Sequence, residues 1–513
     1  MEIHPAYRTR FVRIDPLELN GTRAEDVRWV EQRLRLDASV GLPGTAAIHA
    51  QFDVLDGVLW GENGSFGREP QVVSGLGIAS KTGNLAGWRV GLLPGGDPLN
   101  PDDYGPVLRP IAPIQVNYAY GEVLFPIGVL RIGRQPMADG ASLATHDGRR
   151  GRNLWGVSSA HQSADRILFG TKISELWRLL VEGDNYTPDT RLDRGVLLGL
   201  VYDVLVQDEV ISPKDDLQGF AAQLSMKLDQ SDFLGPAFKD IELTGTVRSL
   251  WDERFRTSIL AFPLKAGITA GPVDIRADFL ILDGTTRELA AGFSEFTSEE
   301  VVDQELEGMG ARVRARWSPG PVHLVAEYAY ASGDADPRVT TPQTSMSWAR
   351  DSNLGLLLFE HSLAFQSARA AAVGIENLRQ LDAESFPLTE IATEGRVTNV
   401  HALFPQFFWD ISPSLRLKTG ALFAWTDVPA LDPIQTSIRL DGEAIDDDAV
   451  NFHGGPPGNY WGTEFDIGLE WAFRNAFQFV LEGGVLLPGD AMHDENGDAV
   501  PSWILETRFT FAL

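Results

Sequence analysis

The sequence predicts an all-β protein, a transmembrane antiparallel barrel whose 513 residues form one domain. Three observations indicate that class: apolar and polar residues alternate along much of the chain, tight turns alternate with long polar connections, and the last segment is an amphipathic strand. Alternation with a period of two indicates a strand because successive side chains point to opposite faces. No apolar run approaches the ~20 residues of a spanning helix, so only strands could cross a bilayer.

The alternation is clearest in residues 310–317, where three arginines (Arg312, Arg314 and Arg316) alternate with apolar residues. The same period recurs in the segments 31–42, 47–57, 273–284, 415–425 and 463–471. A bilayer holds no water to satisfy a free sheet edge, so a membrane-spanning sheet has to close on itself. The apolar faces are then predicted to meet lipid, with these residues pointing outward: Leu34, Phe52, Phe279, Val313, Leu417 and Phe465.

The connections fall into two length classes. Tight turns occur at 41–44, 125–128, 270–272, 318–321, 412–414 and 474–476, and long polar stretches at 57–111, 136–163, 285–302, 333–395, 428–459 and 488–501. Short periplasmic turns and long extracellular loops are typical of outer-membrane barrels, for which we predict about eighteen strands, or about sixteen as the alternative. A barrel that wide needs a constriction, so at least one of the loops 57–111, 136–163 and 333–395 is expected to fold inward.

The final segment supports a location in the outer membrane of a Gram-negative bacterium. In PSWILETRFTFAL (501–513) one face carries aromatic and apolar residues, and this pattern resembles the recognition signal of outer-membrane barrel proteins. Outer-membrane lipid and lipopolysaccharide are therefore expected partners. The opening residues Met-Glu-Ile-His lack the features of a signal peptide, so the chain is expected to be a mature form.

Composition excludes several function classes. The net charge of −28 argues against binding nucleic acid, which needs a basic surface. No cysteine is present, and no catalytic motif is found, although His161 lies near three serines (Ser158, Ser159 and Ser163). We expect a protein without enzymatic activity and without a cofactor. Calcium bound to the loop residues 494–498 is a further candidate, but the full twelve-residue calcium pattern is missing.

Charged residues on the inward faces are the candidate pore-lining residues. They are Arg33, Arg35, His49, Asp53, Arg131, Arg134, Arg248, Arg254, Arg256, Arg276, Arg312, Arg314, Arg316, Glu327, Arg416 and Lys418. One interpretation is a wall of mutually neutralising ion pairs. The other is a set of basic tracks that guide an anionic solute, because guanidinium groups bind carboxylate or phosphate bidentately and stay charged.

Three stretches are similar to a known family. YGEVLFPIGVLRIGRQP (120–136), SNLGLLLFE (352–360) and WGTEFDIGLEWAFRNAFQFVLEGGVLLPG (461–489) resemble the alginate-export type of outer-membrane porin. The resemblance implies an eighteen-stranded barrel with an arginine-lined pore for an anionic polysaccharide, served by periplasmic export partners. Arg131 and Arg134 match the implied constriction best.

Three functions follow as hypotheses. The first is a porin that passes an anionic saccharide, an exopolysaccharide or a small anionic solute. The second is a general diffusion porin without a dedicated substrate, for which mixed wall charge suffices. The third is a surface or adhesion protein that acts through acidic loops such as 441–451 and uses the barrel as an anchor.

Overall fold

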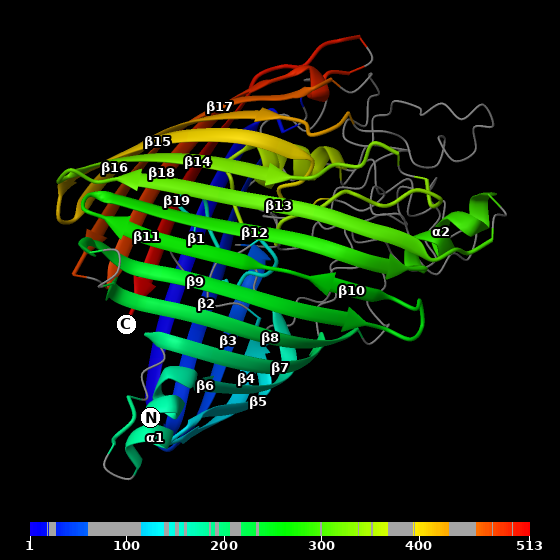
Figure 1. Ribbon diagram of the computed structural model, residues 1–513. Coiled ribbons are helices and arrows are strands. Elements are labelled where there is room, and N and C mark those ends of the chain that lie inside the picture. The colour runs from blue at the N-terminus through cyan, green and yellow to red at the C-terminus, as the bar shows by residue number, and fades with distance from the viewer. Residues whose placement is uncertain are drawn as a thin grey trace.

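The computed structural model shows a closed barrel of antiparallel strands in one sheet (Figure 1). The strands are β1 (Glu2–Asp15), β2 (Val27–Leu42), β3 (Ala46–Leu59), β4 (Ile114–Phe125), β5 (Gly128–Pro136), β6 (Ser163–Lys172), β7 (Gly195–Leu205), β8 (Gln218–Ser231), β9 (Gly235–Trp251), β10 (Ser258–Ala261), β11 (Leu264–Ala270), β12 (Val273–Thr286), β13 (Gln304–Trp317), β14 (Val322–Ala331), β15 (Val400–Ser412), β16 (Leu415–Trp425), β17 (Tyr460–Phe473), β18 (Phe477–Pro488) and β19 (Ser502–Ala512). Two α-helices, α1 (Ile173–Glu182) and α2 (Glu288–Thr297), lie in connections, and a π-helical turn, η2 (Leu358–Leu363), follows β14.

The structure describes only part of the chain. The described residues are 1–17, 19, 27–59, 114–137, 143–148, 153–158, 162–183, 186–189, 194–205, 217–231, 235–297, 300–336, 338–349, 352–367, 393, 395–429, 458–474, 476–494 and 496–513. The expected loop 57–111 lies outside this set beyond Leu59, as do most of 428–459 and the candidate residue His161. Among the residues described, no helix has the length and apolar character needed to cross a membrane.

The barrel closes because β1 pairs with both β2 and β19. Each strand otherwise pairs with its neighbours in sequence, and β10 and β11 together fill one place between β9 and β12. Pro263, which has no N–H, lies at the break between them, where Phe262 still donates to the Ile281 carbonyl at 2.9 Å. The result is eighteen strands, so the predicted fold is confirmed.

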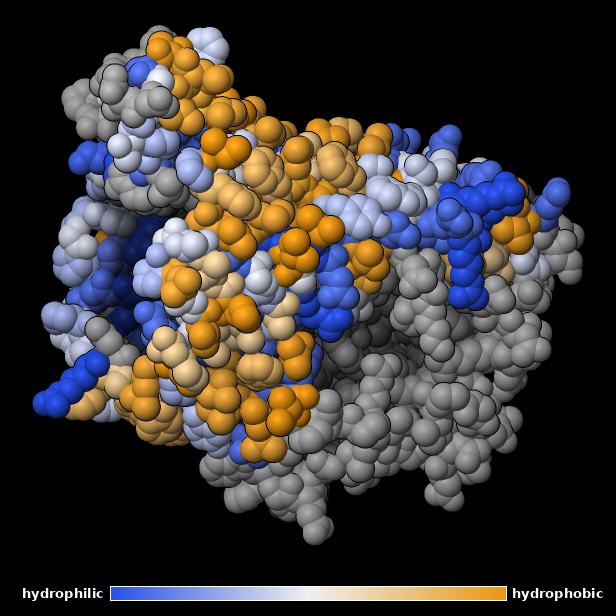
Figure 2. Space-filling view, turned by 90° about the horizontal axis from the view of Figure 1, so that it is seen from below, coloured by the Kyte–Doolittle hydropathy of each residue, from blue (hydrophilic) through white to orange (hydrophobic). Residues whose placement is uncertain are grey.

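An apolar belt surrounds the barrel. Phe279 and Phe465 are exposed on the outer face, as predicted, and their neighbours in sequence point the other way. Figure 2 shows hydrophobic side chains gathered over the outer wall and hydrophilic side chains inside the opening at its left. This distribution is the reverse of a soluble sheet, in which the apolar face is buried.

The two rims of the barrel differ. Tight turns such as 43–45, 126–127 and 271–272 lie on one rim, which we call the short-turn rim, and both chain ends lie there (Figure 1). The connection between β14 and β15, which contains η2, starts from the opposite rim. Outer-membrane barrels place their tight turns on the periplasmic side. The short-turn rim of this barrel is therefore its periplasmic rim.

Parts of two long connections fold into the barrel, as expected for at least one loop. We call the described residues of 143–158 and 343–367 the inner segments. Their apolar side chains form a core with inward-facing wall residues of β1, β14, β15, β16 and β19. Trp155, Trp348 and Phe359 of the inner segments are almost completely buried. The lumen is therefore partly filled by packed chain.

Candidate functional site

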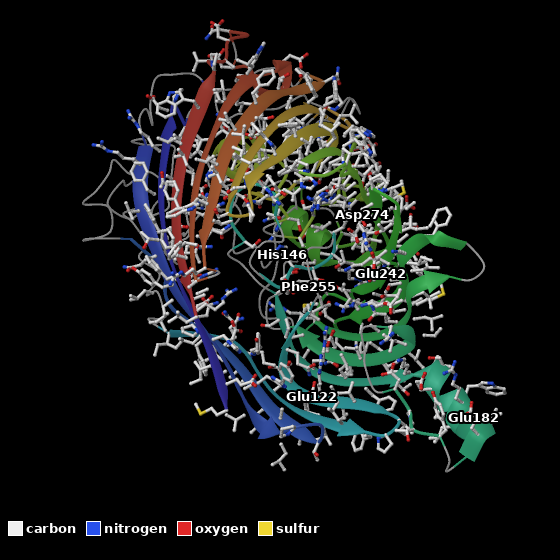
Figure 3. The ribbon with its side chains drawn as sticks, turned by 90° about the vertical axis from the view of Figure 1, so that its left-hand side faces the viewer. Glu122, His146, Glu182, Glu242, Phe255 and Asp274 are labelled. Carbon is white, nitrogen blue, oxygen red and sulfur yellow. The ribbon has the colours of Figure 1, made fainter. Side chains whose placement is uncertain are left out.

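The inward faces of the strands form two regions with different surroundings. We call the inward faces of β14–β19, β1 and β2 the covered arc, because the inner segments pack against them. We call the short-turn ends of β4, β5, β8, β9, β11 and β12 the open arc, because their inward charges are partly exposed. Figure 3, seen from the short-turn side, shows Glu122, Glu242 and Asp274 on this arc and His146 further inside the barrel.

Arg10 of β1 is the most buried cation of the covered arc. Its side chain has no exposed surface and lies 2.7 Å from Glu506 of β19, 3.1 Å from Glu360 of η2 and 3.5 Å from Glu31 of β2. One guanidinium therefore joins the first strand, the last strand and an inner segment. A buried charge is stable only when such partners replace the water it has lost.

Glu464 of β17 binds the backbone at the start of η2. Its carboxylate accepts hydrogen bonds from the N–H groups of Leu356, Leu357 and Leu358 at 2.5, 2.9 and 2.7 Å. The first N–H groups of a helix have no partner within the helix, so an anion placed there satisfies them. The covered arc thus fixes the position of this inner segment through a single buried side chain.

Other wall cations donate to carbonyl groups of the inner segments. The contacts are Arg35 to Gly148 at 2.8 Å, Lys418 to Leu154 at 2.7 Å, Arg8 and Arg33 to Ser158 at 3.4 Å each, and Arg312 to Asn353 at 3.4 Å. Arg35 also donates to Asp53 through Nε and Nη2, at 2.7 and 2.6 Å. Several predicted pore-lining cations therefore hold the inner segments in place.

The inner segments are joined to each other at Asn353. Its side-chain amide donates to Glu360 at 2.7 Å and to the carbonyl of Val157 at 3.3 Å. Beside it, burial and the charge of Arg10 lower the pKa of His361 to about 3, so this imidazole is neutral at physiological pH. In the connection between β14 and the second segment, burial raises the pKa of Asp334 to about 6.

The open arc pairs its charges but leaves them in contact with water. Arg131 lies 2.7 Å from Glu122, Arg276 lies 2.8 Å from Asp274, and His49 of the neighbouring β3 lies 3.8 Å from Glu122. The side chain of Arg276 is 39% exposed, against 0% for Arg10. Exposed pairs of this kind contribute little to stability, because water screens them.

The arginine row on β13 lies between the two arcs and has fewer anions than cations. Arg312 and Arg314 share one carboxylate, Glu327, at 2.5 and 3.3 Å. Arg316 donates to the hydroxyl of Ser318 at 3.2 Å. Asp278 faces Arg312 and Asp274 faces Arg316 across the sheet, but Asp278 also faces Lys265 on its other side and Asp274 lies 2.8 Å from Arg276. The row therefore carries a local surplus of positive charge.

The remaining predicted residues of the wall are also paired. Arg248 lies 3.5 Å from Asp203, which Arg166 binds more closely at 2.6 Å. Arg416 lies 2.5 Å from Asp410. Lys418 lies 2.5 Å from Glu482 and 2.8 Å from Glu470. Taken with Arg35, Arg131 and Arg276, these contacts match the ion-pair interpretation of the inward charges at these positions.

Three predicted pore-lining residues lie elsewhere, and the prediction for them is wrong. Arg134 pairs with Asp165 at 3.0 Å on the outer face, because it is three residues from Arg131 and strict alternation places the two on opposite sides. Arg254 and Arg256 lie beyond the end of β9, in the connection to β10. They cannot form a track with Arg312, Arg314 and Arg316.

Sequence reasoning also missed residues that the structure brings together. Arg8 and Arg10 alternate with outward residues in β1 just as Arg33 and Arg35 do in β2, so the same period could have identified them. Glu360 had no such signal, because it lies in an apolar stretch outside the strands. Within the described part of the chain, no group of three or more His, Asp or Glu is arranged to hold a metal ion. In the expected calcium loop, Asp494 accepts bonds from the backbone of Asn496 and Asp498.

Comparison with known proteins supports the fold and one family. Residues 271–504 match the family model described as alginate export, which confirms the resemblance expected from the sequence. No curated protein matches the chain. Among solved structures, OccK9 (OpdG) of Pseudomonas aeruginosa aligns over 100% of this chain and 98% of its own, with 12% identity and a TM-score of 0.51.

Two further solved structures have the same coverage of this chain and lower scores. OpdK of Pseudomonas aeruginosa, in its structure with vanillate, is 11% identical over 98% of its length, with a TM-score of 0.49. OccAB4 of Acinetobacter baumannii is 10% identical over 99% of its length, with a TM-score of 0.47. The likeness to OccK9 shows a shared fold, that of an outer-membrane porin.

Proposed function

We propose that this porin passes anionic saccharides, including segments of an acidic exopolysaccharide, through the space between the open arc and the inner segments. The observation that carries the proposal is the arginine row on β13, where Arg314 and Arg316 remain partly exposed while sharing few carboxylates. The match to the alginate export family supports it, since residues 271–504 include this row.

The physical reason is local charge. A surplus cation in a narrow, partly desolvated channel attracts anions more strongly than the same cation on an open surface. Guanidinium groups also suit saccharide carboxylates, because their planar donors can bind both oxygens. The ion pairs of the open arc add hydrogen-bond donors on the arginines and acceptors on the carboxylates. A sugar hydroxyl group can bind to both.

The test replaces the two exposed arginines with glutamine (R314Q and R316Q together). Arg312 is left unchanged because it supports Asn353 of the inner segments. In planar bilayers under a salt gradient, the wild-type reversal potential should indicate anion preference, and the double variant should shift toward cations, more so at low salt. R134Q is the matched control, since Arg134 lies on the outer face, and it should leave the reversal potential unchanged.

A second candidate, a general diffusion porin, is favoured by the paired charges of the open arc. Arg131 with Glu122, and Arg276 with Asp274, cancel one another locally. A wild-type reversal potential near zero, unchanged in R314Q/R316Q, would support this candidate and contradict anion selectivity. Periplasmic export partners and lipopolysaccharide remain part of the proposal for the first candidate.

A further inference from the structure

Helix α1 carries an apolar stripe that no described part of the protein covers. The helix connects β6 to β7 at the short-turn rim. Trp177, Leu180 and Val181 are 67%, 73% and 67% exposed, and Ile173 on the same stripe is 37% exposed. Their spacing of four, seven and eight residues from Ile173 places all four on one face. Exposed large apolar side chains in such a contiguous group indicate a binding surface.

The helix is held firmly by a different face. Leu176 and Leu179 line a small apolar cavity with Phe125 and Ile127, in and next to the β4–β5 turn. Glu175 accepts hydrogen bonds from the hydroxyl of Tyr186 and from the backbone N–H of Asp189, the latter at 2.9 Å. These contacts fix the orientation of α1, so the stripe is presented in one direction.

The position of α1 indicates what meets the stripe. Figure 3 shows the helix, marked by Glu182, extending outward beyond the barrel wall, and Figure 2 shows its hydrophobic surface at the upper left continuing into the apolar belt. Ile167 of β6 and Leu200 of β7, the two strands that α1 joins, are exposed on that belt. The polar residues Arg178 and Glu182 occupy the remaining face of the helix.

We propose that α1 is an interfacial helix that inserts its stripe into the periplasmic leaflet of the outer membrane beside the barrel. A helix with one apolar face in the headgroup–acyl boundary and a charged face in water is the usual form of an interfacial anchor. Tryptophan favours this depth because its ring is apolar while its N–H reaches the headgroups. The helix would fix the depth and rotation of the barrel in the membrane.

The chain contains no cysteine, so single cysteine variants give a direct test. Leu180→Cys carries a nitroxide label in the full-length protein, reconstituted into vesicles of phosphatidylethanolamine and phosphatidylglycerol. The label should be more accessible to oxygen than to a water-soluble nickel complex, as a label at Phe279 of the lipid-facing wall should be. Arg178→Cys, on the polar face of the same helix, should show the opposite preference.

Val181→Cys repeats the measurement at a second stripe position in case Leu180→Cys fails to fold. Equal accessibility of stripe and polar-face labels to the nickel complex would overturn the proposal and leave the stripe as a surface for a periplasmic protein. The outcome is independent of ion selectivity, so it stands whether or not the channel prefers anions.

Discussion

The covered arc and the open arc use the same residue types for different purposes. In the covered arc, Arg10 has three carboxylates around it, no exposed surface and a direct link to an inner segment. In the open arc, Arg276 has a close carboxylate partner, Asp274, and a side chain that is 39% exposed. Arginine on the inward face of a barrel is therefore not by itself a sign of a solute track.

The difference shows where the wall is structural and where it is available to a solute. The covered arc satisfies backbone groups of the inner segments through Glu464, Arg35 and Lys418. The open arc and the exposed end of the β13 row keep their charges in contact with water. Substitutions in the first region should change stability and constriction, whereas those in the second should change selectivity.

The largest effect is expected from Arg10→Met compared with Arg276→Met. Removing one partner of a buried ionic group typically costs about 3–5 kcal/mol, because the carboxylates remain buried without a counter-charge. Loss of an exposed pair typically costs less than about 1 kcal/mol. Urea unfolding in detergent micelles, followed by gel mobility of unheated samples, measures both. Equal destabilisation by the two variants would remove the basis for separating the arcs.

A second effect concerns the constriction. Glu464→Ala removes the acceptor of three buried N–H groups of Leu356, Leu357 and Leu358. Each unsatisfied group costs roughly 1–3 kcal/mol, so this inner segment should detach and fluctuate. Single-channel recording should show a larger and noisier conductance. Glu242→Gln on the open arc is the control and should keep a quiet open state; a wild-type conductance in Glu464→Ala would argue against an anchoring role for this residue.

The smallest effect is a pH dependence confined to the covered side. Burial raises the pKa of Asp334 to about 6 from an ordinary value of 3.8. Between pH 3.8 and about pH 6, Asp334 keeps its proton in the folded state but has released it in the unfolded state. The free energy of unfolding therefore falls as the pH rises through this range. After correction for the intrinsic change of exchange rate with pH, the hydrogen-exchange protection factors of residues 332–336 and 338–346 should therefore be larger at pH 4 than at pH 7.

Asp334→Asn should remove this pH dependence, because the amide does not titrate. Backbone amides of β9, on the open arc, serve as the internal reference and should show only the intrinsic change of exchange rate with pH. A pH response of 332–336 and 338–346 that survives in Asp334→Asn would assign it to another group.

The barrel could be predicted from the sequence because lipid imposes a pattern that water does not. Each strand had to present apolar side chains outward, and this alternation is visible in segments such as 310–317. The sequence does not predict the break between β10 and β11. Both short strands pair with β9, so together they occupy the place of one strand in the sheet. The local sequence pattern predicts that a strand exists, whereas the hydrogen bonds to the adjacent strands decide whether it runs without a break.

The site was only partly predictable. Alternation placed Arg312, Glu327 and Lys418 on the inward face, but it could not tell which of them touch an inner segment. That information lies in contacts between residues far apart in sequence, such as Arg10 with Glu360. Arg134 lies three residues from Arg131, and a period of two places residues at such odd spacing on opposite faces of a strand, so the pattern itself puts Arg134 outside.

The pairing of β1 with β19 has a consequence for assembly. β19 comprises eleven residues and is the strand whose pairing with β1 closes the sheet. Arg10 reaches Glu506 only when this strand joins the first, and the same guanidinium binds Glu360 of the inner segment. One guanidinium therefore takes part both in closing the wall and in holding an inner segment, so a barrel whose β19 has not paired with β1 would lack one of the carboxylates that stabilise this buried cation.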